Sequence, residues 1–205
     1  MGYVKNTSYY TGEVYEFNLP TGWSCPFAKE CLVKVDKNTG KFDIKADRYK
    51  CYAAYSERYP AVRKHRWNNL KSVFENKTIP ELPVGAKSIR IHASGDFFNQ
   101  EYFDLWLEFC NKHPEVEFWA FTKSVGYWVA RIGEIPSNLV LTASYGGRQD
   151  ALIYKHSLKH CIVVKTRREA KGLPIDTNDD YARLKDVNFA LLDNQANNKT
   201  KTTID

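Results

Sequence analysis

The feature that most constrains the fold is a repeated unit in which a short apolar segment ends in a polar turn. A helical segment, Gln100–Lys112, separates the first two units. Strands that alternate with helices through short connections indicate a parallel α/β sheet. The three units are Lys87–Ala93 with Ser94-Gly95-Asp96, Glu117–Phe121 with Thr122-Lys123-Ser124, and Leu139–Ala143 with Ser144-Tyr145-Gly146-Gly147.

The length of the chain limits how far such a sheet can close. A full barrel of eight βα units needs about 250 residues, and this chain has 205. We therefore expect an α/β fold, either a partial (truncated) βα-barrel or an open, mostly parallel sheet, with Cys161–Lys165 as a further strand. Residues 1–193 are predicted to form a single domain, and the polar residues 194–205 a disordered tail.

Ligands of open α/β sheets and of barrels bind at the carboxyl ends of the strands. The polar turns lie at this edge, so their side chains are the predicted binding residues. An Asx turn or a helix cap is the structural alternative for each turn. The candidates are Ser94, Gly95, Asp96, Thr122, Lys123 and Ser144.

Three cysteines near the start of the chain are the candidate metal ligands. Cys25, Cys31 and Cys51 belong to a loop-like segment, residues 23–54, with a turn predicted at 36–40. Thiolates favour zinc or an iron–sulfur cluster. Three of them leave a coordination position open, unless His65 or Cys161 completes the site. The cysteines could instead be small buried hydrophobic residues, as we expect for Cys110.

Two groups of basic residues have alternative interpretations. The basic residues of Arg58–Lys71 surround a predicted helix, Ala61–Phe74, whose apolar face would include Val73 and Phe74. With its aromatic residues it could bind nucleic acid or a host protein, or it could be a solvated helix face. Arg90 and His92 are predicted to share one strand face, which in a barrel would point into the lumen and require a partner.

Composition restricts the location. The first residues show no signal peptide, and no apolar run of about 18 residues is present, so we expect no membrane span. Five cysteines are an odd number, which argues against a framework of disulfides alone. A cytoplasmic location, where thiols stay reduced, is expected. The net charge of +6 permits nucleic-acid contact without requiring it.

The motifs form a series that resembles a known family. Cys25 to Cys31, Cys51-Tyr52-Ala53, Ile89 to Phe98 and Phe121 to Ser124 together are similar to the phage family called gene product eighty-eight. The likeness is sharpest from Phe17 to Ser144. It implies a phage protein in the cytoplasm of the host cell, and it implies no settled activity.

The same series also resembles phage proteins similar to radical-SAM enzymes. This likeness implies a [4Fe–4S] cluster on Cys25, Cys31 and Cys51, with S-adenosylmethionine at the open iron and its amino group at Ser94-Gly95-Asp96. The cysteine gaps of five and nineteen residues depart from the compact Cys-x3-Cys-x2-Cys motif. The expected function is an iron–sulfur protein, with radical-SAM-like catalysis on nucleic acid or nucleotide as an extension. Alternatives are a non-enzymatic, metal-stabilised binding module and a hydrolase that uses His92 and Asp96.

Overall fold

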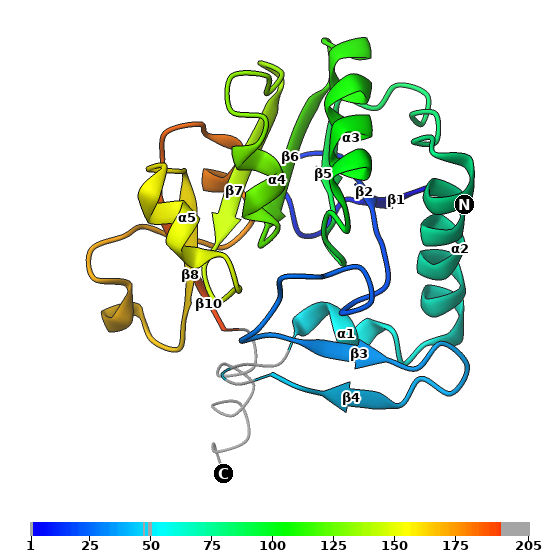
Figure 1. Cartoon of the computed structure of the whole chain (residues 1–205), viewed down its shortest axis with the longest axis horizontal. Helices are drawn as coiled ribbons and strands as arrows, with labels where there is room; N and C mark the ends of the chain where they lie inside the picture. Colours follow the sequence, from blue (N-terminus) through cyan, green and yellow to red (C-terminus); the bar gives the residue numbers. More distant parts are fainter. Residues whose placement is uncertain (1, 47, 49–50, 194–205) are drawn as a thin grey trace.

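The computed structural model describes residues 2–46, 48 and 51–193. Strands and helices alternate through most of the chain after residue 88 (Figure 1). The strands are β1 (Tyr3–Asn6), β2 (Val14–Phe17), β3 (Val33–Val35), β4 (Phe42–Ile44), β5 (Ser88–Ile91), β6 (Glu117–Thr122), β7 (Leu139–Ser144), β8 (His160–Val164), β9 (Ile175–Asp176) and β10 (Phe189–Leu192). The helices are α1 (Tyr52–Ser56), α2 (Pro60–Asn76), α3 (Gln100–Lys112), α4 (Val125–Val129) and α5 (Asp150–Lys155), with 3₁₀ turns η1 (Arg167–Ala170) and η2 (Tyr181–Arg183).

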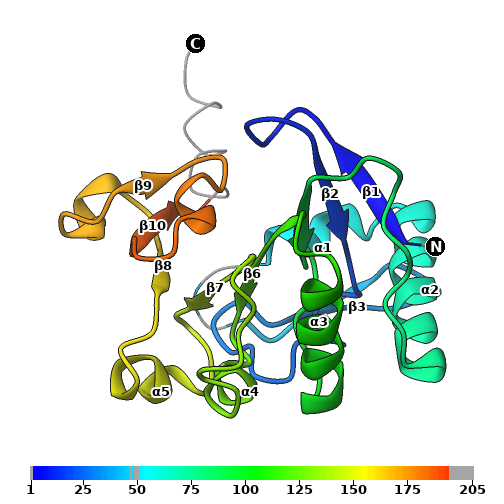
Figure 2. The ribbon, with the colours of Figure 1, turned by 90° about the horizontal axis from the view of Figure 1, so that it is seen from above.

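Eight strands form one sheet in the order β1-β2-β5-β6-β7-β8-β10-β9. The sheet curls into an open half-barrel, as the view from above shows (Figure 2). The pairings from β2 to β9 are parallel, and β1 pairs with β2 in the antiparallel sense. The α/β class and the partial barrel are therefore confirmed, with the correction that the sheet is mixed.

The two faces of the sheet carry different cores. Helices α3 and α4 pack on the outer face, against a cluster that includes Ile89, Phe118 and Leu141 (Figure 2). The inner, concave face is covered near the carboxyl-terminal strands by η2 and carries a second cluster, which includes Trp119, Val140 and Phe189. Alternating residues of each strand thus enter opposite cores, as the period of two requires.

Helix α3 coincides with the predicted helical segment Gln100–Lys112. The side chain of Asn99 caps it by accepting a hydrogen bond from the backbone N–H of Tyr102 at 2.8 Å. Its buried face includes Tyr102, Trp106, Phe109 and Cys110. This helix fixes β5 and β6 in the sheet, and so fixes the turns that follow them.

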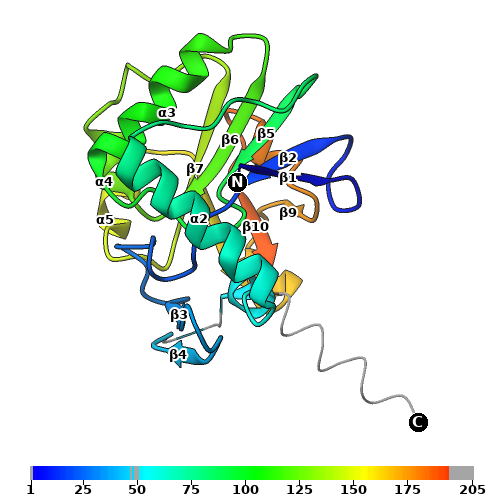
Figure 3. The same cartoon turned by 90° about the vertical axis from the view of Figure 1, so that its right-hand side faces the viewer.

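Helix α2 differs from the expectation. Its buried face holds Arg63, Arg66 and Asn69 together with Val73, whereas Phe74 is 65% exposed. The predicted apolar face was therefore wrong at Phe74, because α2 packs largely on loops whose carbonyl groups need hydrogen-bond donors. Figure 3 shows α2 extending from the sheet to the region of β3 and β4.

The cysteine-bearing segment contains a separate two-stranded hairpin. Strands β3 and β4 pair in the antiparallel sense, and the Asp36 side chain accepts from the backbone N–H groups of Asn38 and Thr39 in the connecting turn. The turn predicted at 36–40 is thus confirmed. The predicted tail, residues 194–205, lies outside the described residues. Within the described part of the chain, no helix is long and apolar enough to cross a membrane.

Candidate functional site at the carboxyl edge of the sheet

Polar side chains from three successive strand ends meet at the carboxyl edge of the sheet. Asp96 accepts hydrogen bonds from the Thr122 hydroxyl at 2.6 Å and from the backbone N–H of Lys123 at 2.8 Å. The Lys123 ammonium group donates to the Ser144 hydroxyl at 2.7 Å and to the carbonyl oxygens of Ser144 and Tyr145. The turns after β5, β6 and β7 therefore form one connected network.

The Ser94 turn has a structural role as well as a place in this network. The Ser94 hydroxyl donates to the carbonyl oxygen of Leu19 at 2.8 Å, and the Ser94 N–H donates to the Asn18 side chain. Gly95 has a φ of +92°, and a Cβ there would come within 2.6 Å of Leu19 and Ser24. The turn thus holds the segment that leads directly to Cys25.

The loop between Cys25 and Cys31 pairs with the turn after β7. The N–H of Glu30 donates to the Gly146 carbonyl at 3.0 Å, and the N–H of Arg148 donates to the Phe27 carbonyl at 2.8 Å. An isolated antiparallel bridge joins Ala28 to Gly147. These backbone contacts place the cysteine loop on the edge where Asp96 and Lys123 lie.

The three candidate thiols lie close enough to influence one another electrostatically. Burial raises the pKa of the Cys25 thiol well above its usual range, and the negative charges of Asp96, Cys51 and Cys31 raise it further. Burial likewise raises the pKa of Cys51 to about 11, and the Cys31 charge adds to this effect. Lys123 opposes the rise at Cys31. The structure therefore brings Cys25, Cys31 and Cys51 to Asp96 and Lys123.

Backbone N–H groups near each thiol oppose the rise of its pKa. They belong to Gly22 for Cys25, to Cys31 itself, and to Ala53 and Ala54 for Cys51. All three cysteines are free and half-buried. In the residues that the structure describes, no group of three or more His, Cys, Asp or Glu side chains is arranged to hold a metal ion.

The other two cysteines and the nearest histidine lie elsewhere. Cys110 is buried in the outer core, as expected, and Cys161 is buried in the concave core of β8. The ring of His65 contacts the carbonyl oxygen of Gly2 at 3.1 Å, beside Asn69. Of the two candidates for a fourth ligand, Cys161 therefore belongs to the concave core, and His65 contacts Gly2 and Asn69.

Asp96 is the most perturbed carboxylate of the edge. Burial raises its pKa to about 6, although hydrogen bonds from Thr122, Lys123 and Phe97 oppose the change. A carboxylate of this kind carries a negative charge at neutral pH and can accept hydrogen bonds from a cationic ligand. Three donors of the chain itself, from Thr122, Lys123 and Phe97, already form hydrogen bonds with this carboxylate.

The concave face holds a buried ion pair that the sequence indicated only in part. The Arg90 guanidinium lies 2.9 Å from the Asp179 carboxylate and donates to the Tyr10 hydroxyl at 2.9 Å. It also donates to the Tyr52 hydroxyl at 3.2 Å, and its plane lies over the Phe121 ring. The partner that a lumenal Arg90 requires is therefore Asp179, from the loop between β9 and η2.

The prediction that Arg90 and His92 share a face was wrong. Strand β5 ends at Ile91, and His92 has a φ of +63°, which turns its side chain to the outer face. There its Nε2 lies 2.8 Å from the Tyr102 hydroxyl, under α3. Burial lowers the pKa of His92 to about 3, so the ring is neutral.

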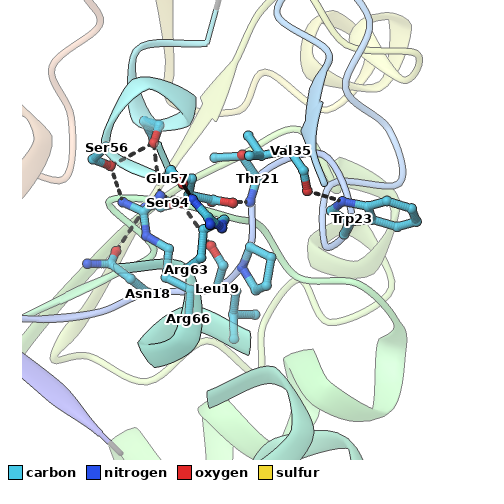
Figure 4. A network of polar contacts seen from close by, with 12 residues as sticks. Asn18, Leu19, Thr21, Trp23, Val35, Ser56, Glu57, Arg63, Arg66 and Ser94 are labelled. Carbon is cyan, nitrogen blue, oxygen red and sulfur yellow. Dashed lines mark hydrogen bonds and ion pairs between the residues drawn. The ribbon is translucent and has the colours of Figure 1, made fainter. Parts of the chain in front are cut away.

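The basic segment Arg58–Lys71 is not a uniform solvated face. Arg63 donates to four backbone carbonyl groups, two of them in the turn after β3, at Lys37 and Asn38. Arg66 donates to a carboxylate oxygen of Glu57 at 2.8 Å, and the backbone N–H of Thr21 donates to the same oxygen at 2.7 Å (Figure 4). These two arginines hold the cysteine-bearing segment on α2 and are buried, which corrects their predicted exposure.

Fold and site together define a class: an α/β half-barrel with a cysteine-bearing loop seated on the carboxyl edge of its sheet. A family model described as "Gene product 88" matches residues 3–204, so the chain belongs to the gene product 88 family. This confirms the predicted resemblance to the gene product eighty-eight family; the family model and the relatives give no support to the predicted resemblance to radical-SAM-like proteins.

Two curated relatives carry the same name. The chain is 28% identical over 131 residues to the Gene 88 protein of Mycobacterium phage L5, and 27% identical over 131 residues to the Gene 88 protein of Mycobacterium phage D29. Each alignment covers 55% of this chain and 48% of the relative, so the chain spans about half the length of these proteins. No solved structure matches the chain.

Proposed function

We propose that this phage protein binds a [4Fe–4S] cluster through Cys25, Cys31 and Cys51. The observation that carries the proposal is the backbone pairing of the Cys25–Cys31 loop with the turn after β7, which places this loop on the edge that also holds Asp96 and Lys123. The charge of Cys51 acts on Cys25 and so belongs to the same neighbourhood. Three thiolates can bind three irons of a cluster and leave the fourth iron open. A structural zinc site usually has four protein ligands.

The surroundings of the thiols support a cluster. Backbone N–H groups near all three thiols favour their thiolate forms, and hydrogen bonds to sulfur are one of the means by which proteins set cluster potentials. Lys123 adds a positive charge near Cys31. A cluster bound by three thiolates carries net negative charge, so these donors and the ammonium group stabilise it.

The polar turns lie on the same edge as the cysteine loop, which supports S-adenosylmethionine as a ligand of the proposed cluster. Ser94, Gly95 and Asp96 match the turn that contacts the methionine amine in the radical-SAM-like proteins that this chain resembles. Thr122, Lys123 and Ser144 would line the same edge. A bound cluster would supply one-electron chemistry; the residues of this chain would bind and orient the ligand. The activity of the whole protein is part of the proposal, and so is the host cytoplasm, where ligand thiols stay reduced.

Electron paramagnetic resonance of the reduced protein tests the proposal. We expect a cluster signal in anaerobically reconstituted protein, and a change of that signal when S-adenosylmethionine is added. Cys25→Ser should lose the signal, whereas Cys110→Ser should keep it, because Cys110 belongs to the outer core. Asp96→Asn should weaken the response to S-adenosylmethionine while the cluster remains. A zinc-containing protein without a cluster would contradict the proposal.

A further inference from the structure

The positive charge of the chain is concentrated in one segment. Residues 31–71 contain eleven Lys and Arg against four Asp and Glu, an excess of seven, whereas the whole chain has a net charge of +6. The rest of the chain is therefore close to neutral. The segment includes the β3–β4 hairpin, α1 and most of α2, which lie together at one end of the molecule (Figure 1).

Two tryptophans meet between the hairpin and α2: Trp67 belongs to this segment, and Trp23 precedes it in the chain. The ring centroids of Trp23 and Trp67 are 5.8 Å apart. The Lys34 ammonium lies 4.6 Å from the Trp23 ring, and the Lys37 ammonium lies 5.0 Å from the Trp67 ring. We call these four residues the Trp23 surface.

Trp23 is held in place while much of its ring stays accessible. Its indole N–H donates to the Val35 carbonyl at 2.9 Å, which fixes the ring against the edge of β3 (Figure 4). The side chain is nevertheless 49% exposed. A fixed, half-exposed indole beside two ammonium groups offers a flat apolar face next to positive charge.

Helix α2 extends the positive charge past Trp67. Lys64 and Lys71 are three and four residues from Trp67, so the three share one side of the helix, and both lysines are exposed. The acidic groups nearby are engaged: Asp36 accepts from the turn of the hairpin, Asp43 pairs with Lys45, and Glu75 pairs with Lys71. Glu57 is buried against Arg66.

We propose that the Trp23 surface binds single-stranded nucleic acid. Bases stack on exposed aromatic rings, and lysines beside those rings neutralise the phosphates. Trp23 would stack a base, with Lys34, Lys37 and Lys64 along the backbone. This binding is independent of the proposed cluster and does not use the buried Arg63 and Arg66.

Fluorescence anisotropy with a labelled single-stranded oligothymidylate tests this inference on the full chain. We expect binding at low salt that weakens linearly in a plot of log affinity against log salt. Lys34→Ala combined with Lys37→Ala should reduce the magnitude of the slope by about 1.4, because each lost phosphate contact contributes about 0.7 for single strands. Both lysines have solvent-accessible side chains, so this variant should fold.

Trp23→Ala tests the stacking part. We expect affinity to fall by about 5- to 100-fold, the effect of losing one stacked base. The controls are Tyr154→Ala, at a ring that is 86% exposed on α5, and Lys155→Ala beside it; both should bind like the unaltered protein. Circular dichroism verifies the fold of each variant. Absence of binding at low salt, or a folded Trp23→Ala protein with unchanged affinity, would overturn the inference.

Discussion

The Tyr52 hydroxyl donates a hydrogen bond to the carbonyl oxygen of Ala93 at 2.8 Å. Tyr52 follows Cys51, and Ala93 precedes the Ser94 turn, so this bond joins the cysteine-bearing segment to the end of β5. Arg90 donates to the same hydroxyl from the concave face of the sheet. One phenol thus connects the candidate metal ligands, the polar turn and the buried ion pair with Asp179.

Removing this hydroxyl should loosen the cysteine-bearing segment. For Tyr52→Phe we expect a loss of about 1 to 2 kcal/mol in the free energy of unfolding, since the Ala93 carbonyl and the Arg90 guanidinium each lose a partner. Urea denaturation measures it. Tyr55→Phe is the matched control on the same helix, because its ring packs on Phe42 and the substitution keeps that ring. Equal effects of the two substitutions would contradict the role given to Tyr52.

Substitutions of a buried arginine and of an exposed lysine on α2 should change the free energy of unfolding by clearly different amounts. Arg66→Ala leaves the buried Glu57 carboxylate without its ion-pair partner and should cost about 3 to 5 kcal/mol. Lys64→Ala, at an exposed position of the same helix, should change the free energy of unfolding by less than about 0.5 kcal/mol. Thermal or urea unfolding of the two variants measures this difference. Equal losses would mean that Arg66 is solvated and is not a structural partner of Glu57.

The sequence predicted the repeated strands and their polar turns because strand and helix periods are local properties. It also predicted that Asp96, Thr122, Lys123 and Ser144 converge, because parallel strands end at one edge. The contacts it missed depend on distant parts of the chain. Arg90 and Asp179 are 89 positions apart in the sequence, and no local pattern marks that pairing.

The errors have specific causes. His92 leaves the alternation of β5 because its backbone is left-handed, which a period of two cannot reveal. The burial of Arg63 and Arg66 was not visible either, since a charged residue is usually exposed and their partners lie in loops. The short strands β9 and β10 were not predicted; β10 adds to the parallel sheet beyond β8.

Two glycines of similar backbone conformation should respond differently to an added methyl group. Gly95 and Gly133 have φ values of +92° and +93°, but only at Gly95 would a Cβ meet neighbouring atoms, at 2.6 Å from Leu19 and Ser24. Gly133→Ala should cost about 1 to 2 kcal/mol for the strained backbone. Gly95→Ala should cost about 1 to 3 kcal/mol more, because of overpacking. Comparable unfolding midpoints for the two variants would refute the close approach of the loop to the turn.

His92 should make the protein less stable in acid. Its pKa is about 3 in the folded protein and about 6.5 in the unfolded chain, so the unfolded chain binds the proton first as pH falls. The stability that the neutral His92 ring contributes is therefore fully present above pH 6.5, and this contribution is lost as the pH falls toward 3. At pH 5 the loss from this group is about 2 kcal/mol.

The variant His92→Asn isolates that effect. Asparagine does not titrate and tolerates the left-handed backbone. The difference in unfolding free energy between the variant and the unaltered protein should shrink by about 2 kcal/mol from pH 7 to pH 5. A difference that stays constant over this range would mean that the folded protein takes up a proton at His92 as readily as the unfolded chain.

The most direct test of the central claim is the iron, acid-labile sulfide and zinc content of protein purified without oxygen. We expect about four irons and four sulfides per chain, lost in Cys25→Ser, Cys31→Ser and Cys51→Ser and retained in Cys110→Ser. Protein that contains neither iron nor sulfide after anaerobic reconstitution, or that holds zinc on the same three cysteines, would contradict it.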